Sequence, residues 1–269
     1  MERFFFTFFL FFVSTFMCAS IDKHFIVVTA SYNNVDWYKK NLLSIFNQEY
    51  DNWSLIYIDD CSVDGTGEFV EQFVSQNNMY HKVNIIHNMK RMGHCYNQYH
   101  AIQQCPDDAI IVIVDGDDWL AHDGVFSYLN KVYQDDVWIT YGQFQYYKRG
   151  ARGCSRQIPN YVIEQNGIRD YGPWVTSHLR TFYAGLYKKI KHEHLMLNGN
   201  YLSMSVDAAT MIPMIEMAGW HSKFIPDILY MYNDINSLSF FHDRREQQRI
   251  ILNTIRGYAK YEPLQKLFH

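Results

Sequence analysis

The chain has 269 residues, enough for one large domain or two small ones with a sizeable hydrophobic core. Its 24 basic and 28 acidic residues give a formal net charge of −4. Because proteins that bind nucleic acid usually present a basic face, this balance argues against a nucleic-acid partner.

The first twenty residues differ from the rest of the chain. Arg3 precedes an apolar run from Phe4 to Ala19, and small residues end the run. The run is shorter than the ~20 residues that span a bilayer, so it matches a secretory signal peptide better; an uncleaved signal anchor is the alternative. We therefore expect residues 1–20 to send the chain to the secretory lumen or out of the cell, and any membrane attachment to be confined to them.

The next part of the chain alternates between apolar strands and helical patterns. We expect strands at 25–30, 55–58, 83–86, 110–114 and 137–141, with helices at 35–48, from 64–66 onward, at 96–104 and at 124–133. The expected buried stripe of the second helix is Phe69, Val70, Phe73 and Val74. This rhythm predicts an α/β fold in one domain, with a Rossmann-like, mostly parallel sheet flanked by helices.

The second half of the chain loses that rhythm. Residues 147–160 are polar and basic and read as a mobile loop. Helical segments are expected at about 175–197 and 207–218, a short strand at 224–232 and a terminal helix at 243–260. Cys61, Cys95, Cys105 and Cys154 have no CxxC spacing, so neither a zinc site nor a disulfide framework is predicted.

An acidic cluster follows the most apolar expected strand. Asp115, Asp117 and Asp118 come directly after residues 110–114. Carboxylates this close oppose one another's ionisation unless a cation lies between them, and Mg²⁺ or Mn²⁺ would accept their oxygens as ligands. Asp and Gly are also common in ordinary turns, so at this point both interpretations stay open.

Two other expected strands end in similar polar segments, at 29–34 and 59–66. The carboxyl ends of parallel strands lie at one edge of a sheet, where α/β proteins bind their ligands. The three segments together therefore favour a crevice for a nucleotide and a metal ion.

Three segments together resemble family 2 glycosyltransferases of GT-A fold: 27–33 (VVTASYN), 58–66 (IDDCSVDGT) and 115–118 (DGDD). The resemblance covers about residues 25–235. It implies a GT-A domain over 21–235, with 236–269 forming a loop and a helix that pack on it. The implied activity is that of a metal-dependent, inverting glycosyltransferase of hexosyltransferase type. Such an enzyme moves a sugar from a nucleoside-diphosphate sugar to a hydroxyl of a glycan, protein or lipid acceptor.

The resemblance also implies which residues bind the nucleotide. Thr29, Ser31 and Tyr32 would border the nucleoside. A carboxylate of Asp59 or Asp60 would accept a hydrogen bond from the base, with Asp60 slightly favoured.

The diphosphate and its metal ion are implied to bind nearby. Arg91 would contact the diphosphate, because a guanidinium can bind such an anion in a bidentate manner; a solvated surface arginine is the alternative. Asp115 and Asp117 correspond to the ribose and metal carboxylates, and Asp117 would hold Mn²⁺ or Mg²⁺ most directly. Asp118 would orient its neighbours or cap the next helix. Many members carry a histidine after the last strand, and His242 is the nearest candidate here.

The acceptor side is implied with less detail. Asp207 matches the acidic residue that serves as general base, although it is also placed where a helix N-cap would lie. Val206 occupies a position at which many members have a second acidic residue. His178 and Arg180 fall where acceptor-side residues would lie, and Trp174 is a candidate for stacking on a sugar; structural roles are the alternative for all three.

Two other classes of function remain open. A nucleotidyltransferase would also use carboxylates and Mg²⁺, but it usually has a glycine-rich, basic loop after its first strand, and residues 31–34 contain neither Gly nor Lys. A non-catalytic relative that binds a sugar or a nucleotide is the other possibility, because a fold does not guarantee activity.

Overall fold

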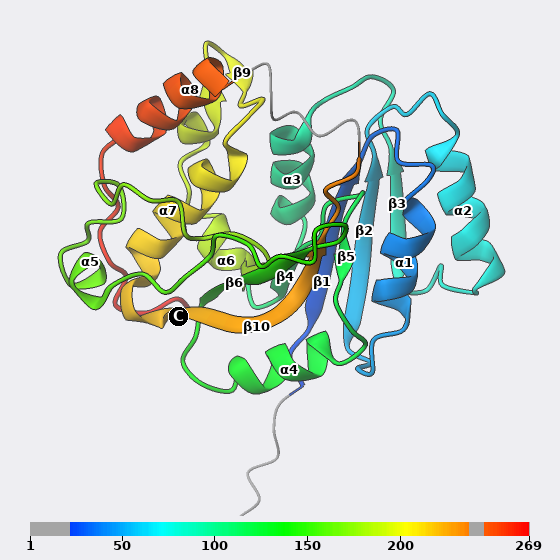
Figure 1. Ribbon diagram of the computed structural model, residues 1–269, viewed down its shortest axis with the longest axis horizontal. Coiled ribbons are helices and arrows are strands. Elements are labelled where there is room, and N and C mark those ends of the chain that lie inside the picture. The colour runs from blue at the N-terminus through cyan, green and yellow to red at the C-terminus, as the bar shows by residue number, and fades with distance from the viewer. Residues whose placement is uncertain (1–21, 237–244, 269) are drawn as a thin grey trace, which may run out of the picture.

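An eight-stranded sheet forms the centre of the computed structural model, which describes residues 22–236 and 245–268 (Figure 1). Its strands are β1 (Phe25–Ser31), β2 (Trp53–Asp59), β3 (Val83–His87), β4 (Ile110–Ile113), β5 (Trp119–Leu120), β6 (Ile139–Tyr146), β7 (Arg180–Tyr183) and β10 (Ser222–Tyr232). They follow the spatial order β3-β2-β1-β4-β7-β6-β10-β5, in which β5 and β7 run antiparallel to their neighbours. The mostly parallel α/β sheet predicted from the sequence is confirmed.

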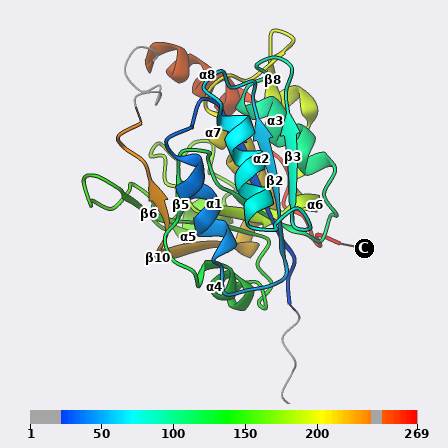
Figure 2. The same ribbon diagram turned by 90° about the vertical axis from the view of Figure 1, so that its right-hand side faces the viewer.

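Helices cover both faces of the sheet. The helices are α1 (Tyr38–Phe46), α2 (Thr66–Gln76), α3 (His94–Gln103), α4 (Val125–Val132), α5 (Asn160–Glu164), α6 (Ala184–Tyr187), α7 (Val206–Ala218) and α8 (Arg245–Gly257). Figures 1 and 2 show α1 and α2 on one face and α3, α6 and α7 on the other. Two short 3₁₀ helices, η1 (His192–Leu195) and η2 (Gly219–His221), and a small hairpin of β8 (Met196–Leu197) and β9 (Asn200–Tyr201) complete the fold.

The inner strands form because their side chains are apolar on both faces. Phe25, Val27 and Ile110 are fully buried, as expected for strands of a parallel sheet that helices cover on both sides. The register pairs Ser31 with Asp59 and Val28 with Ile113, so β1, β2 and β4 end at the same edge. The polar segments that follow these strands therefore meet there.

Strand β7 corrects the sequence analysis, which predicts a helix over 175–197. Residues 180–183 instead form an antiparallel strand between β4 and β6. The fully buried Thr181 fixes it there, because its Oγ1 lies 2.8 Å from the Tyr133 hydroxyl and 2.6 Å from Thr140 Oγ1. The expected buried stripe of α2 also needs correction: Phe69 is 44% exposed and stacks on Tyr38 at the surface.

The C-terminal segment packs against α7. Ile251 and Ile255 of α8 are buried, and the Tyr261 amide donates a hydrogen bond to Glu216 Oε2 at 3.1 Å. Glu216 also forms a fully buried ion pair with Arg169, at 2.6 Å. Residues 1–20 and His242 lie outside the described residues. Within 22–236 and 245–268, no helix combines the length and the hydropathy that a membrane span requires.

Candidate functional site

The loops after β1 and β2 are locked together at the carboxyl edge of the sheet. The Asn33 amide donates to Ser62 Oγ, and the Asn33 side chain accepts from the Val63 amide, both at 2.9 Å. The Asn34 amide donates to Thr66 Oγ1, also at 2.9 Å. These reciprocal bonds hold two of the three predicted polar segments in one fixed arrangement.

The acidic turn after β4 lies against the same structure. A side chain at Gly116 would collide with Ser31, because a Cβ there would lie 2.6 Å from the serine side chain. Asn41 of α1 donates from Nδ2 to the carbonyl oxygens of Asp115 and Asp118, at 3.0 and 2.8 Å. The turn therefore has a defined shape at the carboxyl edge of the sheet.

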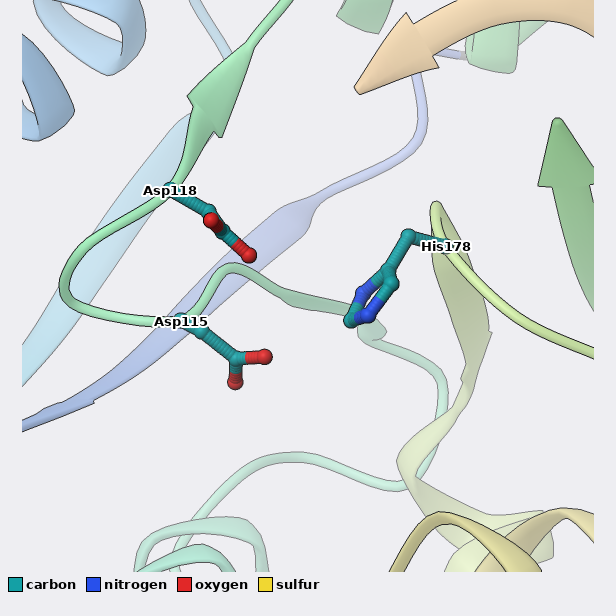
Figure 3. Close-up of side chains that lie close together, drawn as sticks. All are labelled: Asp115, Asp118 and His178. Carbon is teal, nitrogen blue, oxygen red and sulfur yellow. The ribbon is translucent and has the colours of Figure 1, made fainter. Parts of the chain in front are cut away.

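Two of these carboxylates lie close to a histidine side chain. The ligand atoms of Asp115, Asp118 and His178 all lie within 4.8 Å of one another. Figure 3 shows the two carboxylates projecting from the loop after β4 toward the imidazole ring. His178 comes just before β7, so the insertion of β7 beside β4 brings it to the turn.

Asp118 connects the turn to the end of β10. Its Oδ2 accepts a hydrogen bond from the Tyr230 hydroxyl at 2.8 Å, and its Oδ1 accepts one from the Asn233 amide at 2.6 Å. Burial and the charges of Asp117 and Asp115 hold the pKa of Asp118 well above its usual range. Asp118 thus positions the segment that crosses the site.

Asp117 is held by that same segment. Its Oδ2 accepts a hydrogen bond from Asn236 Nδ2 at 2.7 Å. Burial, followed by the nearby charge of Asp115, raises the pKa of Asp117 to about 6. A carboxylate in this state binds a proton more readily than usual, and a divalent cation would relieve the same electrostatic cost.

Asp115 has a cationic neighbour. Arg180 Nη2 lies 3.7 Å from Asp115 Oδ2. Although burial raises the pKa of Asp115, the charges of His94 and Arg180 outweigh it and lower the pKa below its usual value. Burial also lowers the pKa of His178 to about 3, so this imidazole is neutral at physiological pH.

The resemblance to family 2 glycosyltransferases implies a divalent cation, and these residues fit one. Asp115 Oδ1 is buried and accepts no hydrogen bond within the described part of the chain, so an oxygen lone pair is available. Carboxylate oxygens and one neutral imidazole are ligands that Mn²⁺ or Mg²⁺ accepts. The site is therefore a possible metal site rich in aspartate.

The residues expected around the nucleoside lie beside this site. Thr29 is fully buried and its Oγ1 has no hydrogen-bond partner among the described residues, whereas Ser31 Oγ accepts from Asn34 Nδ2 at 3.0 Å. The guanidinium of Arg91 lies over the ring of Tyr32, 3.9 Å from its centre. Arg91 therefore packs on the loop after β1.

Asp60 organises the loop that carries Arg91. Its Oδ1 accepts from Asn88 Nδ2 and the Met92 amide, both at 2.8 Å, and its Oδ2 accepts from the Gly93 amide at 2.9 Å. Burial raises the pKa of Asp60, but hydrogen bonding to Asn97, Met92, Asn88 and Gly93 outweighs burial and lowers it. The neighbouring Asp59 differs, because its buried Oδ1 has no partner in the described ranges.

The expected acceptor-side residues lie on separate elements. Asp207 is half-buried in the first turn of α7, where its Oδ1 accepts from the Ala208 amide at 2.9 Å; Ser205 occupies the N-cap position. Figure 1 shows α7 beginning on the side of the molecule where β1 and β2 end. Trp174 is half-buried against the core, whereas His178 and Arg180 lie beside Asp115.

Sequence comparisons identify proteins that are similar to this chain. A family model described as "Glycosyl transferase family 2" matches residues 26–195. Glycosyltransferase GlyG of Streptococcus pneumoniae is 26% identical over 219 residues, which cover 77% of this chain and 69% of GlyG.

Solved structures share the fold. S. aureus TarS 1-349 in complex with UDP-GlcNAc matches with a TM-score of 0.65 at 15% identity, over 86% of this chain and 65% of that chain. The mannosyltransferase PcManGT from Pyrobaculum calidifontis, in complex with GDP-Man and Mn²⁺, matches with a TM-score of 0.62 at 15% identity, over 90% and 67%. The GT-A fold expected from the sequence is confirmed.

Proposed function

The chain belongs to glycosyl transferase family 2, and we propose that it is a metal-dependent, inverting enzyme that moves a sugar from a nucleoside-diphosphate sugar to an acceptor hydroxyl. The observation that carries this proposal is the cluster of carboxylates and one neutral histidine at the carboxyl edge of the sheet. The two solved neighbours with bound UDP-GlcNAc and GDP-Man support a nucleotide-sugar donor.

Different residues at the carboxyl edge of the sheet would bind different parts of the donor. Asp115 and His178 of this cluster would hold Mn²⁺ or Mg²⁺, and Asp117 of the same turn would add the ligand that the sequence predicts. A divalent cation at this position would neutralise charge that develops on the departing nucleoside diphosphate. Arg91, held over Tyr32, would contribute a guanidinium to the same anion.

Asp207 would act on the acceptor. In an inverting transfer, the acceptor oxygen attacks the anomeric carbon from the face opposite the leaving diphosphate, and the acceptor proton passes to the carboxylate of Asp207. General-base catalysis of this kind contributes ~10²–10⁴-fold. The fixed arrangement of the crevice must supply most of the remaining rate enhancement through positioning and charge stabilisation.

A thermal-shift panel tests donor binding. Nucleoside diphosphates, nucleoside triphosphates and nucleotide sugars are added to the chain with Mn²⁺ and with EDTA. A ligand that binds only the folded state raises the melting temperature, so the preferred donor should give the largest Mn²⁺-dependent shift. A shift with nucleoside triphosphates alone would instead favour a nucleotidyltransferase, and no shift with any donor would refute the proposal.

Residues 1–20 are the basis for a proposal about the cellular location of the chain. Their signal-like pattern supports entry into the secretory lumen or export, with attachment to the membrane if the segment is retained. The acceptor would then be a glycan, protein or lipid in that compartment.

A further inference from the structure

A cavity lies near the amino ends of β6 and β10, away from the acidic turn. The register pairs Ser222 with Ile139 and Phe224 with Tyr141, whereas Tyr232 and Tyr146 pair at the carboxyl edge. At ~3.3 Å per residue, Phe224 and Tyr232 are about 26 Å apart along β10. The cavity is therefore separate from the proposed donor site.

The cavity has the size of a small-ligand pocket. Its volume is about 280 Å³. Pockets for small molecules begin at roughly 300 Å³, so this one suits a ring-sized group better than a long ligand. It is lined by Tyr141, Gln157, Ile158, Asn160, Ile163, Trp220, Ser222, Lys223 and Phe224.

An exposed indole forms part of the lining. Trp220 is 61% exposed in η2, and the Ser222 hydroxyl holds that turn by donating to the Gly219 carbonyl at 2.7 Å. The rings of Tyr141 and Phe224 lie 5.6 Å apart in the same lining. The Tyr141 hydroxyl accepts from the Ile158 amide at 2.9 Å, which fixes the segment around Ile158 beside these rings.

Polar groups complete the lining. The side chains of Gln157 and Asn160 are exposed and form no hydrogen bond with any residue that the structure describes. Each amide offers a donor and an acceptor. Lys223 pairs with Asp135 at 3.3 Å, so its charge is partly compensated.

We propose that this cavity is a saccharide-binding site that holds one sugar unit of a glycan chain, a function beyond glycosyl transfer. The C–H groups of a pyranose pack on the electron-rich face of an indole, and its hydroxyls match side-chain amides that both donate and accept. A purely apolar occupant would bury those amides without partners, which costs free energy. The cavity volume suits one ring.

A glycan microarray tests the site without involving catalysis. The wild-type chain is applied in EDTA and without nucleotide, and we expect it to retain a defined set of oligosaccharides. Trp220→Ala should weaken this retention at least tenfold, and the double variant Gln157→Ala/Asn160→Ala should weaken it several-fold. Tyr80→Ala, which removes a similarly exposed aromatic side chain (58%), serves as the matched control and should bind like wild type.

Further variants separate this proposal from that of glycosyl transfer. Asp117→Asn should keep glycan retention, and Trp220→Ala should keep donor binding in the thermal-shift panel. If wild type retains glycans but binds no nucleotide-sugar donor, only the proposed transfer is refuted. If wild type retains no glycan, or Trp220→Ala retains glycans as well as wild type does, the saccharide site is refuted.

Discussion

The side-chain amide of Asn236 donates a hydrogen bond to Asp117, with 2.7 Å between Nδ2 and Oδ2. The same Nδ2 lies 3.3 Å from Asn34 Oδ1, and the preceding Asn233 amide donates to Asp118. The segment after β10 therefore lies across both the acidic turn and the loop after β1. This arrangement links the ionisation of Asp117 to the position of that segment.

Removing this amide should alter metal binding in a pH-dependent way. The hydrogen bond from Asn236 favours the charged form of Asp117, so Asn236→Ala should raise the pKa of Asp117 above its value of about 6. Titration with Mn²⁺ should then show a larger loss of affinity at about pH 6.5 than at about pH 8. Asn84→Ala, on the exposed face of β3, is the control; an equal effect of Asn236→Ala at both pH values would contradict the account.

Neutralising Asp117 should stabilise the metal-free protein. Its pKa is raised from 3.8 to about 6, so between these values the folded state holds a proton that the unfolded state has lost. Stability therefore falls as pH rises through this window, and Asp117→Asn should escape that loss. Urea unfolding in EDTA at about pH 7.5 should show Asp117→Asn to be more stable by about 1–3 kcal/mol, with a smaller difference near pH 4. A less stable variant at the higher pH would show that the charged form of Asp117 does not destabilise the folded state.

The loop that carries Arg91 should depend on Asp60. Asp60→Asn leaves an amide group facing the donors of Met92 and Gly93, which should cost about 1–3 kcal/mol. Because the pKa of Asp60 is lowered in the folded state, wild-type protein should also lose this stabilisation as pH falls below 3.8. Thermal unfolding and nucleoside-diphosphate affinity measure both effects, with the exposed Asp36→Asn as control. Unchanged stability and affinity would rule out this role.

Replacing the proposed base, Asp207, should impair sugar transfer without impairing donor binding. Asp207→Asn removes the proton acceptor but leaves the crevice intact, so Mn²⁺-dependent donor binding should persist. Sugar transfer should fall by ~10²–10⁴-fold, the usual contribution of general-base catalysis. Donor affinity is measured by thermal shift and transfer by product formation. Transfer at the wild-type rate would show that another group accepts the proton.

The sequence predicts those parts of the fold that local patterns control. Residues 110–114 form a buried strand because five consecutive β-branched side chains suit a position covered on both faces. The polar segments after β1, β2 and β4 could be placed at one edge because parallel strands share their direction.

Long-range packing determines the rest. The segment Arg180 to Tyr183 is too short to show the alternation of a strand. It forms a strand because its backbone pairs with β4 on one side and β6 on the other. The approach of His178 to Asp115 and Asp118 depends on that strand, so spacing along the chain could not predict it. The hydrogen bonds of Asp60 to Met92 and Gly93 likewise depend on the path of the loop backbone.

The most direct test of the central claim is release of nucleoside diphosphate from the donor that the thermal-shift panel selects. Release is measured for wild type with Mn²⁺, for wild type with EDTA, and for Asp117→Asn with Mn²⁺. We predict release only in the first case, with a further increase when an acceptor is present. Equal turnover in EDTA, wild-type turnover by Asp117→Asn, or no turnover with Mn²⁺ would contradict metal-dependent glycosyl transfer at this site.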